Sequence, residues 1–295
     1  MTDPTGRMTG RFRRIARLSG ALGGSAVKVA GQRWLGIDFD RSAHSRRLQT
    51  ILGDLHGPAM KVAQLLAVVP EALPDEYTTA FAKLQTNAPP MGWSFVQRRM
   101  CAELGSGWAG RFAAFDREPF AAASLGQVHA ATEHDGRLLA CKLQYPDMGR
   151  MIDADLAQLK LALKLFDKAE GAVTTDAAFA EIAERLREEL DYRREAALIR
   201  LYGLMLADVP DICVPEPVPD LSTDRLLTMT RLTGAGIETL KETPEDVRAA
   251  AARKIMTAWY GPFFSFGVLH GDPHPGNYTF GEDGRLNLMD FGCVR

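Results

Sequence analysis

The most informative motif of the sequence lies toward its C-terminal end. It reads His270-Gly271-Asp272-Pro273-His274-Pro275-Gly276-Asn277 and is followed by Leu288-Met289-Asp290-Phe291-Gly292. Between the two strings, the apolar runs Tyr278–Phe280 and Leu286–Met289 are separated by Glu282-Asp283-Gly284, which is typical of a turn between antiparallel strands. We expect this hairpin to return Asp290 to the side of Asn277.

These polar side chains have the spacing of a phosphoryl-transfer site. The reaction needs a carboxylate beside the attacking hydroxyl and oxygen ligands that hold Mg²⁺ against the phosphates, and protein kinases supply them as Asp-x4-Asn followed by Asp-Phe-Gly. On this interpretation Asp272 orients or deprotonates the acceptor. Asn277 and Asp290 bind Mg²⁺, which prefers carboxylate and amide oxygens. The expected cofactors are ATP or ADP and Mg²⁺.

A zinc site at His270 and His274 is a weaker alternative. Two histidines four residues apart can share a helix face, but the prolines and glycines of this stretch prevent a helix. We expect His270 to fix the loop backbone instead. The four cysteines contain no Cys-x-x-Cys pair, which argues against a disulfide framework or a zinc site and favours a reducing, cytoplasmic setting.

A second hairpin is expected between residues 112 and 143, with its turn at Glu133-His134-Asp135-Gly136. Lys142 ends its second strand, where kinases carry the lysine that meets the α- and β-phosphates. The simpler alternative is a solvated lysine, since lysine is rarely buried without a partner. Its partner here is expected to be Glu195, on a single long helix from Asp176 to Leu206. Lys142 and Glu195 thus join Asp272 in the predicted catalytic set.

An alanine-rich loop precedes this strand pair, where a conventional kinase has a glycine-rich flap. Only Gly126 can freely adopt a positive φ there, so we expect a stiff loop that holds the nucleotide. Met229 begins a stretch expected to act as the hinge beside the adenine. The predicted nucleotide-binding residues are Ala121, Ala122, Ala123, Ser124, Gly126, Gln127, Lys142 and Met229.

Three strings together resemble the UbiB/ABC1/ADCK (AarF) family of atypical kinases. They are Ala121-Ala122-Ala123-Ser124-Leu125-Gly126-Gln127-Val128-His129, Cys141-Lys142-Leu143-Gln144-Tyr145-Pro146 and Glu189-Leu190-Asp191-Tyr192-Arg193-Arg194-Glu195-Ala196. The resemblance implies an α+β, protein-kinase-like fold of two lobes with an N-terminal helical extension. It also implies that Lys142 pairs with Glu195 and that Glu189 and Asp191 form a Glu-x-Asp motif.

The resemblance further implies a Lys-x-Gly-Gln motif in the helical extension. The matching string is Lys61-Val62-Ala63-Gln64, in which alanine replaces the glycine. Lys61 is expected to pair with Glu189, and Gln64 lies one helical turn away on the same face. Asp191 and Glu195 are expected to share a helix face. The alternative is an acidic solvated face formed by Glu188, Glu189, Asp191 and Glu195.

The sequence divides into four expected segments: a basic segment at 1–40, a helical extension at 41–110, a kinase-like N-lobe at 111–233 and a partial C-lobe at 234–295. Residues 1–50 hold ten Lys and Arg against three Asp, so a basic amphipathic helix could lie on an anionic membrane surface. The alternative is a solvated helix docked on its own protein. Because the sequence stops just after Asp-Phe-Gly, we expect a truncated C-lobe.

The function implied by the resemblance is an ATP-binding, ATP-hydrolysing regulator of ubiquinone or related isoprenoid-lipid biosynthesis. Its expected location is cytoplasmic and peripheral to a membrane, with quinone-biosynthesis proteins or an isoprenoid lipid as partners and no nucleic acid. Two alternatives stay open. One is a small-molecule phosphotransferase of the aminoglycoside- or choline-kinase type, against which the alanine-rich loop argues. The other is a nucleotide-sensing scaffold without turnover.

Overall fold

The structure is a computed structural model that describes residues 91–123, 125–153, 156–157, 175–272 and 274–295. The chain forms two compact units, Met1–Asn87 with Gly149–Leu186, and Ala88–Met148 with Arg187–Arg295. The basic segment, the expected helices between residues 41 and 84, and the motif residues Lys61 and Gln64 lie outside the described residues. The four-segment division therefore stays a prediction.

The described part of the first unit is helical. It contains residues 149–153 and 156–157 and most of α7 (Thr175–Glu188). Ile152, Leu156 and Leu186 are buried.

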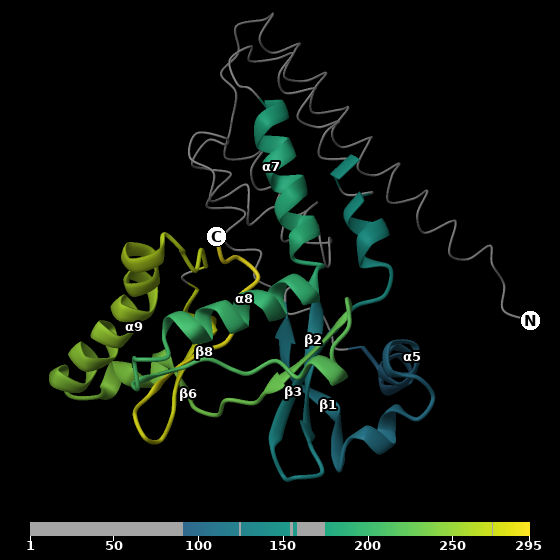
Figure 1. Cartoon of the computed structure of the whole chain (residues 1–295), viewed down its shortest axis with the longest axis horizontal. Helices are drawn as coiled ribbons and strands as arrows, with labels where there is room; N and C mark the ends of the chain where they lie inside the picture. Colours follow the sequence, from purple (N-terminus) through teal and green to yellow (C-terminus); the bar gives the residue numbers. More distant parts are fainter. Residues whose placement is uncertain (1–90, 124, 154–155, 158–174, 273) are drawn as a thin grey trace, which may run out of the picture. The chain divides into compact units, whose positions relative to one another are not determined.

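The first sheet of the second unit is antiparallel, in the order β1-β2-β3-β5 (Figure 1). Its strands are β1 (Ala114–Ala123), β2 (Gly126–Thr132), β3 (Leu138–Gln144) and β5 (Leu226–Thr230). The predicted hairpin is confirmed as β2 and β3, whose turn is closed by a bond from the Glu133 amide to the Arg137 carbonyl. β1 precedes this pair as a third strand.

The two faces of β3 serve different purposes. Leu139, Cys141 and Leu143 face a core with α5 (Trp93–Leu104) and η1 (Trp108–Arg111). Because side chains alternate along a strand, the residues between them point to the other face. There Ala140 joins a second core that includes the buried side of α8 (Tyr192–Met205). The same alternation places Lys142 on the α8 side of the sheet.

The second sheet has the order β4-β8-β7-β6. It consists of β4 (Ile212–Cys213), β8 (Leu286–Leu288), β7 (Tyr278–Phe280) and β6 (Ala235–Gly236), with η2 (Pro219–Leu221), η3 (Ile237–Glu242) and η4 (Pro275–Asn277) in the connections. β7 and β8 form the predicted hairpin, in which Tyr278 pairs with Leu288. The ladder continues as a bond from the Met289 amide to the Asn277 carbonyl, 3.0 Å long, so the two polar loops meet at one end of the hairpin.

The helix before the His-Gly-Asp loop is α9 (Glu245–Phe266), which contacts α8 and β8. It ends at Gly267, whose φ of 72° is the left-handed conformation common at helix ends. Although α9 has 22 residues, none of the helices in the described ranges is long and apolar enough to cross a membrane.

The predicted helix from Asp176 to Leu206 is wrong in one respect, because it is broken into α7 and α8. The amides of Leu190 and Asp191 bond three residues back instead of four, which tightens and ends α7. The Asp191 side chain then accepts a 2.9 Å bond from the Arg194 amide and begins α8 as its N-cap. Asp191 and Glu195 therefore do not share a helix face in the way expected.

Candidate functional site

The centre of the candidate site is the Lys142 ammonium. Its Nζ donates to Glu195 Oε1 at 2.8 Å and Oε2 at 3.0 Å, and to Asp290 Oδ2 at 3.4 Å. The ion pair predicted between Lys142 and Glu195 is therefore present. Only 5% of the Glu195 side chain is exposed, so the alternative of a solvated acidic face does not apply to this residue. Three separate segments of the chain converge on one buried cation.

The charges around Lys142 determine its protonation. Burial alone would lower the pKa of the ammonium, but Asp290 and Glu195 outweigh burial and raise it well above its ordinary value of 10.5. Burial in turn raises the pKa of the Glu195 carboxyl, and Lys142 opposes that rise. Lys142 is thus a fixed positive charge at neutral pH, with Asp290 only 31% exposed beside it.

The ring of Tyr192 contacts this cation, and the sequence analysis did not predict that contact. Lys142 Nζ lies 5.3 Å from the centroid of the Tyr192 ring, within the range of a cation–π contact. The side chain is 1% exposed. The sequence signal for this contact was the position of Tyr192 at the start of α8. Tyr192 precedes Glu195 by three residues and so lies one helical turn away on the same face.

The alanine-rich stretch is a strand end and not a loop. Ala121, Ala122 and Ala123 belong to β1 and pair with Val128, Gln127 and Gly126 of β2. Only two residues separate the strands, and Ser124, one of the two, lies outside the described residues. Small side chains suit this position because the paired strands meet in a tight turn, but any contact of the alanines with a nucleotide stays a prediction.

Gly126 is needed for space and not for a positive φ, which corrects the expectation from sequence. It is absent from the described residues with positive φ. A Cβ at this position would lie 2.1 Å from the carbonyl oxygen of Leu143 on β3 and 3.2 Å from the Tyr192 hydroxyl. The close approach of β2 to β3 beside Lys142 therefore requires glycine.

Gln127 faces the opposite side of the sheet from Lys142. Its Oε1 accepts a 2.7 Å bond from the Met91 amide, and its Nε2 lies 2.7 Å from His129 Nε2. The side chain is 1% exposed, so it is engaged in the α5 side of the core. Gln127 could meet a nucleotide only through its backbone. Met229, by contrast, packs with Ala140 in the core on the Lys142 side.

The His-Gly-Asp loop brings Asp272 and Asn277 together. Asn277 Nδ2 donates to Asp272 Oδ2 at 2.9 Å, and the Asp272 Oδ1 accepts from the His274 amide at 3.3 Å. Gly271 has a φ of 81°, and a Cβ there would lie 2.2 Å from the Cys293 carbonyl oxygen. The loop therefore packs directly on the segment after Asp290.

His270 and His274 have separate structural surroundings. His270 is 1% exposed and lies among the rings of Tyr202, Trp259 and Phe291, with centroids 5.4 to 5.6 Å away. Burial lowers the pKa of His270, so the ring is neutral near pH 7. His274 Nδ1 accepts from the Gly276 amide and caps the short helix η4. This arrangement gives no support to a shared zinc ion.

The segment after Asp290 is bound to the break between α7 and α8. Arg194 donates to the carbonyls of Gly292 and Val294, each at 3.3 Å. Cys293 Sγ lies 4.0 Å from Glu189 Oε1. Arg194 thus positions this segment, a role that sequence reasoning missed. Its signal was its place inside the Glu-x-Asp string.

The polar groups fit a magnesium-bound nucleotide by their chemistry. Asn277 uses its Nδ2 on Asp272, which leaves its amide oxygen as a ligand of the kind that Mg²⁺ prefers. Asp290 supplies a partly exposed carboxylate, a ligand that Mg²⁺ prefers, beside the Lys142 ammonium, which could pair with a phosphate. In the described ranges no group of three or more His, Cys, Asp or Glu forms an all-protein metal site. A magnesium ion held mainly by substrate phosphates needs fewer protein ligands.

Comparison with known families decides the classification. A model of the ABC1 atypical kinase-like domain matches residues 83–295. The chain belongs to the ABC1 atypical kinase-like family. The resemblance seen in the sequence is thereby confirmed, as is the α+β, kinase-like fold class.

Several family members are similar over most of the chain. Atypical kinase COQ8, mitochondrial, from Saccharomyces cerevisiae is 32% identical over 251 residues, which cover 84% of this chain and 50% of that protein. Atypical kinase coq-8, mitochondrial, from Caenorhabditis elegans is 32% identical over 306 residues, covering 97% and 40%. A solved structure from Mycobacterium tuberculosis, described as the complex of Rv3197 with erythromycin, has 34% identity and a TM-score of 0.64, covering 86% and 65%. The chain spans about half the length of the curated relatives it matches.

Proposed function

We propose that this ABC1-family chain binds Mg²⁺–ATP at the Lys142 site and acts as an atypical kinase or ATPase. The observation that carries the proposal is the convergence of Glu195 and Asp290 on the buried Lys142 ammonium. A buried cation with one carboxylate on a helix and another after a hairpin is the arrangement that protein kinases use for the nucleotide phosphates.

Each polar residue has a proposed task. Lys142 binds the α- and β-phosphates, and Glu195 holds the ammonium in position. Asp272 orients the acceptor hydroxyl or a water and accepts its proton, while Asn277 and Asp290 supply oxygen ligands for the metal. Bound Mg²⁺ would neutralise charge that develops on the phosphates. Gly126 and the end of β1 would cover the phosphates with backbone groups.

The proposed biological setting is ubiquinone or related isoprenoid-lipid biosynthesis, at a membrane surface. It is supported by the similarity to the COQ8 atypical kinases and by the basic composition of residues 1–50. Lys61, Gln64, Glu189 and Asp191 are proposed to act together as a family element that regulates access to the nucleotide. The small-molecule phosphotransferase alternative is not favoured, because the family match is to ABC1 proteins.

The test is nucleotide binding measured together with phosphate release on the full chain. We expect Mg²⁺–ATP to raise the melting temperature and phosphate to be released. Asp272→Asn should keep the ATP-dependent shift and lose about 100-fold in release, since an aligned general base contributes 10² or more. The matched control is Asp208→Asn, which changes an exposed carboxylate away from the loop.

Two outcomes would contradict the proposal. If no nucleotide changes the melting temperature of the wild type, the chain does not bind nucleotide at this site. Binding without release in the wild type would support the scaffold alternative and exclude turnover.

A further inference from the structure

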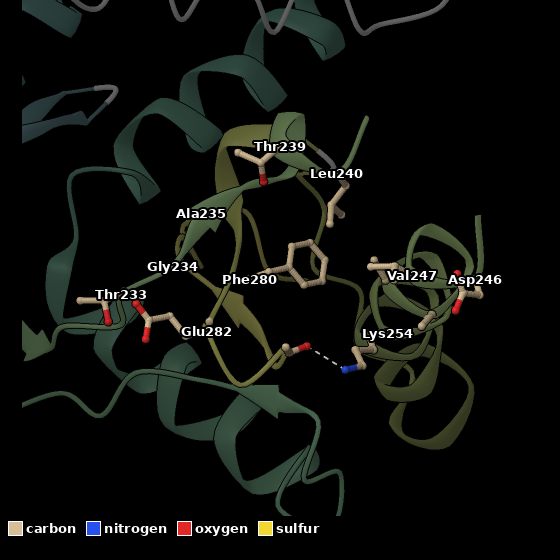
Figure 2. Close-up of a pocket in the computed structure, with 14 residues that line it drawn as sticks. Thr233, Gly234, Ala235, Thr239, Leu240, Asp246, Val247, Lys254, Phe280 and Glu282 are labelled. Atoms are coloured by element: carbon tan, nitrogen blue, oxygen red, sulfur yellow. Dashed lines mark hydrogen bonds between the residues drawn. The ribbon is translucent and has the colours of Figure 1, made fainter. Parts of the chain in front are cut away.

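A pocket of about 740 Å³ lies between η3, α9 and the turn of the β7–β8 hairpin (Figure 2). Its lining contains none of the residues assigned to the nucleotide site. Pockets of 300 to 1,000 Å³ are typical for molecules of drug size. The pocket is therefore large enough for a ligand of its own.

Three apolar side chains define the interior. Phe280 points from β7 toward α9, where Val247 faces it, and Leu240 of η3 lies above them in Figure 2. On the α9 side the wall continues with Ala250 and Ala251, whose small side chains leave the space open. An apolar body, such as an aromatic or alkyl group, would gain by leaving water for this wall.

The charges of the lining are unequal. Lys254, the one cation among the described residues of the lining, donates to the Gly284 carbonyl at 2.8 Å and lies 3.8 Å from the Asp211 carboxylate. Asp246 and Glu282 are exposed carboxylates of the lining, and among the described residues neither has an ion-pair partner. The lysine charge is thus already compensated, while two negative charges are available to a ligand.

We propose that this pocket binds an organic cation with an apolar body, distinct from the nucleotide. Phe280, Leu240 and Val247 take the apolar body, and a carboxylate of the lining, Asp246 on α9 or Glu282 on the hairpin turn, takes the ammonium group. An anionic amphiphile of the same size is disfavoured, because it meets these carboxylates while Lys254 is occupied by Gly284 and Asp211. The proposal is independent of the proposed kinase function.

The experiment compares three probes that share one apolar body, 4-phenylbutylamine, 4-phenylbutanol and 4-phenylbutyrate. Binding to the full chain is measured by ligand-observed saturation-transfer NMR, with titration of each probe. We expect the amine to bind tighter than the alcohol and the carboxylate to bind weakest. The double variant Asp246→Asn/Glu282→Gln should weaken the amine about fivefold, the effect of losing exposed ion pairs, and leave the alcohol unchanged.

Two controls separate this site from general charge and surface effects. Asp208→Asn/Glu118→Gln removes two exposed carboxylates outside the pocket and should leave amine binding unchanged. Ala250→Phe fills the pocket and should abolish binding of all three probes. If that variant does not fold, Val247→Trp fills the pocket from the α9 side, at a position that is 42% exposed and tolerates a larger side chain more easily.

The proposal fails if the amine and the carboxylate bind equally, or if the filling variant binds as the wild type does. A failure of ATP binding would not affect these results, because the pocket shares no residue with that site.

Discussion

Lys142 and Asp272 are held in place in different ways. Lys142 is fixed by partners 53 and 148 residues away, Glu195 and Asp290, in a region where most of the ion pair is buried. Asp272 is fixed by Asn277, five residues away, within one partly exposed loop. The Lys142 side depends on the packing of the whole second unit, whereas the Asp272 side depends on local hydrogen bonds.

The two halves of the site should therefore respond differently to the loss of a partner. A lost partner on the Lys142 side leaves a charge without compensation in the core, which costs stability. A lost partner on the Asp272 side exposes polar groups that water can satisfy, so it should change chemistry more than stability. The following variants test this contrast.

The largest effect on stability is expected from Glu195→Leu. It leaves Lys142 buried with Asp290 as its remaining partner, and breaking a buried pair costs about 4 kcal/mol of the free energy of unfolding. Urea denaturation monitored by circular dichroism measures it. The matched double variant Lys142→Met/Glu195→Leu should recover much of the loss, because it removes both charges. A single variant within 0.5 kcal/mol of the wild type would show that the pair is not buried as described.

The two close-approach glycines should differ in the same test. Gly271→Ala meets the Cys293 carbonyl and also forces a non-glycine residue into positive φ, whereas Gly126→Ala meets only the Leu143 carbonyl and Tyr192. We expect losses of about 3 and about 2 kcal/mol, respectively, from overpacking and strain. Gly110→Ala, where a Cβ meets nothing within 4 Å, is the control. Equal free energies of unfolding for all three variants would contradict the close contacts described at Gly271 and Gly126.

The free energy of unfolding should depend on pH through the protonation of His270. Burial keeps its pKa below the ordinary value of 6.5, so below pH 6.5 the unfolded chain binds a proton that the folded chain does not. The free energy of unfolding should fall as the pH is lowered through that window, by at most about 1.4 kcal/mol per pH unit for this one group. His270→Phe should reduce the slope between pH 6.5 and 5.5, measured by urea titrations at each pH, and leave the contribution of His129, whose pKa burial also lowers. An unchanged slope would mean that His270 is protonated in the folded state.

The smallest effect is expected from Ala123→Gly at the end of β1. Glycine in a strand costs about 0.5 to 1 kcal/mol, so the β1–β2 turn should loosen. We expect the ratio of the dissociation constants for ATP and ADP to change, because only the terminal phosphates would feel the turn. Ala114→Gly, at the other end of β1, should leave that ratio unchanged. If the dissociation constants of ATP and ADP change by the same factor, this turn does not distinguish between the two nucleotides.

Elements with strong local signals could be predicted from sequence. The hairpin turn at Glu133–Gly136 and the hairpin before Asp290 each have a glycine turn between apolar runs, and the structure contains both. The pairing of Lys142 with Glu195 came from combining a strand end with the family strings. Periodicity and turn chemistry were sufficient because each acts within a few residues.

Features that depend on competition between contacts could not be predicted. The break between α7 and α8 arises because Asp191 bonds the Arg194 amide, and an acidic residue inside a helical pattern carries no clear mark of that choice. The side of the sheet that Gln127 faces follows from the register with Leu143, which the sequence does not show. The requirement for glycine at position 126 likewise depends on the distance between β2 and β3, which the sequence does not show.

Asp290, beside Lys142, is proposed to hold Mg²⁺ on a bound nucleotide, and calorimetric titration of ATP measures this contribution. ATP is titrated into the wild type and into Asp290→Asn, once in buffer that contains Mg²⁺ and once in buffer that contains EDTA. We predict that the variant weakens ATP binding on the order of tenfold in Mg²⁺, because a charged metal ligand is lost, and does not weaken it in EDTA. Equal affinities of the two proteins in Mg²⁺, or the same weakening in EDTA, would contradict the account.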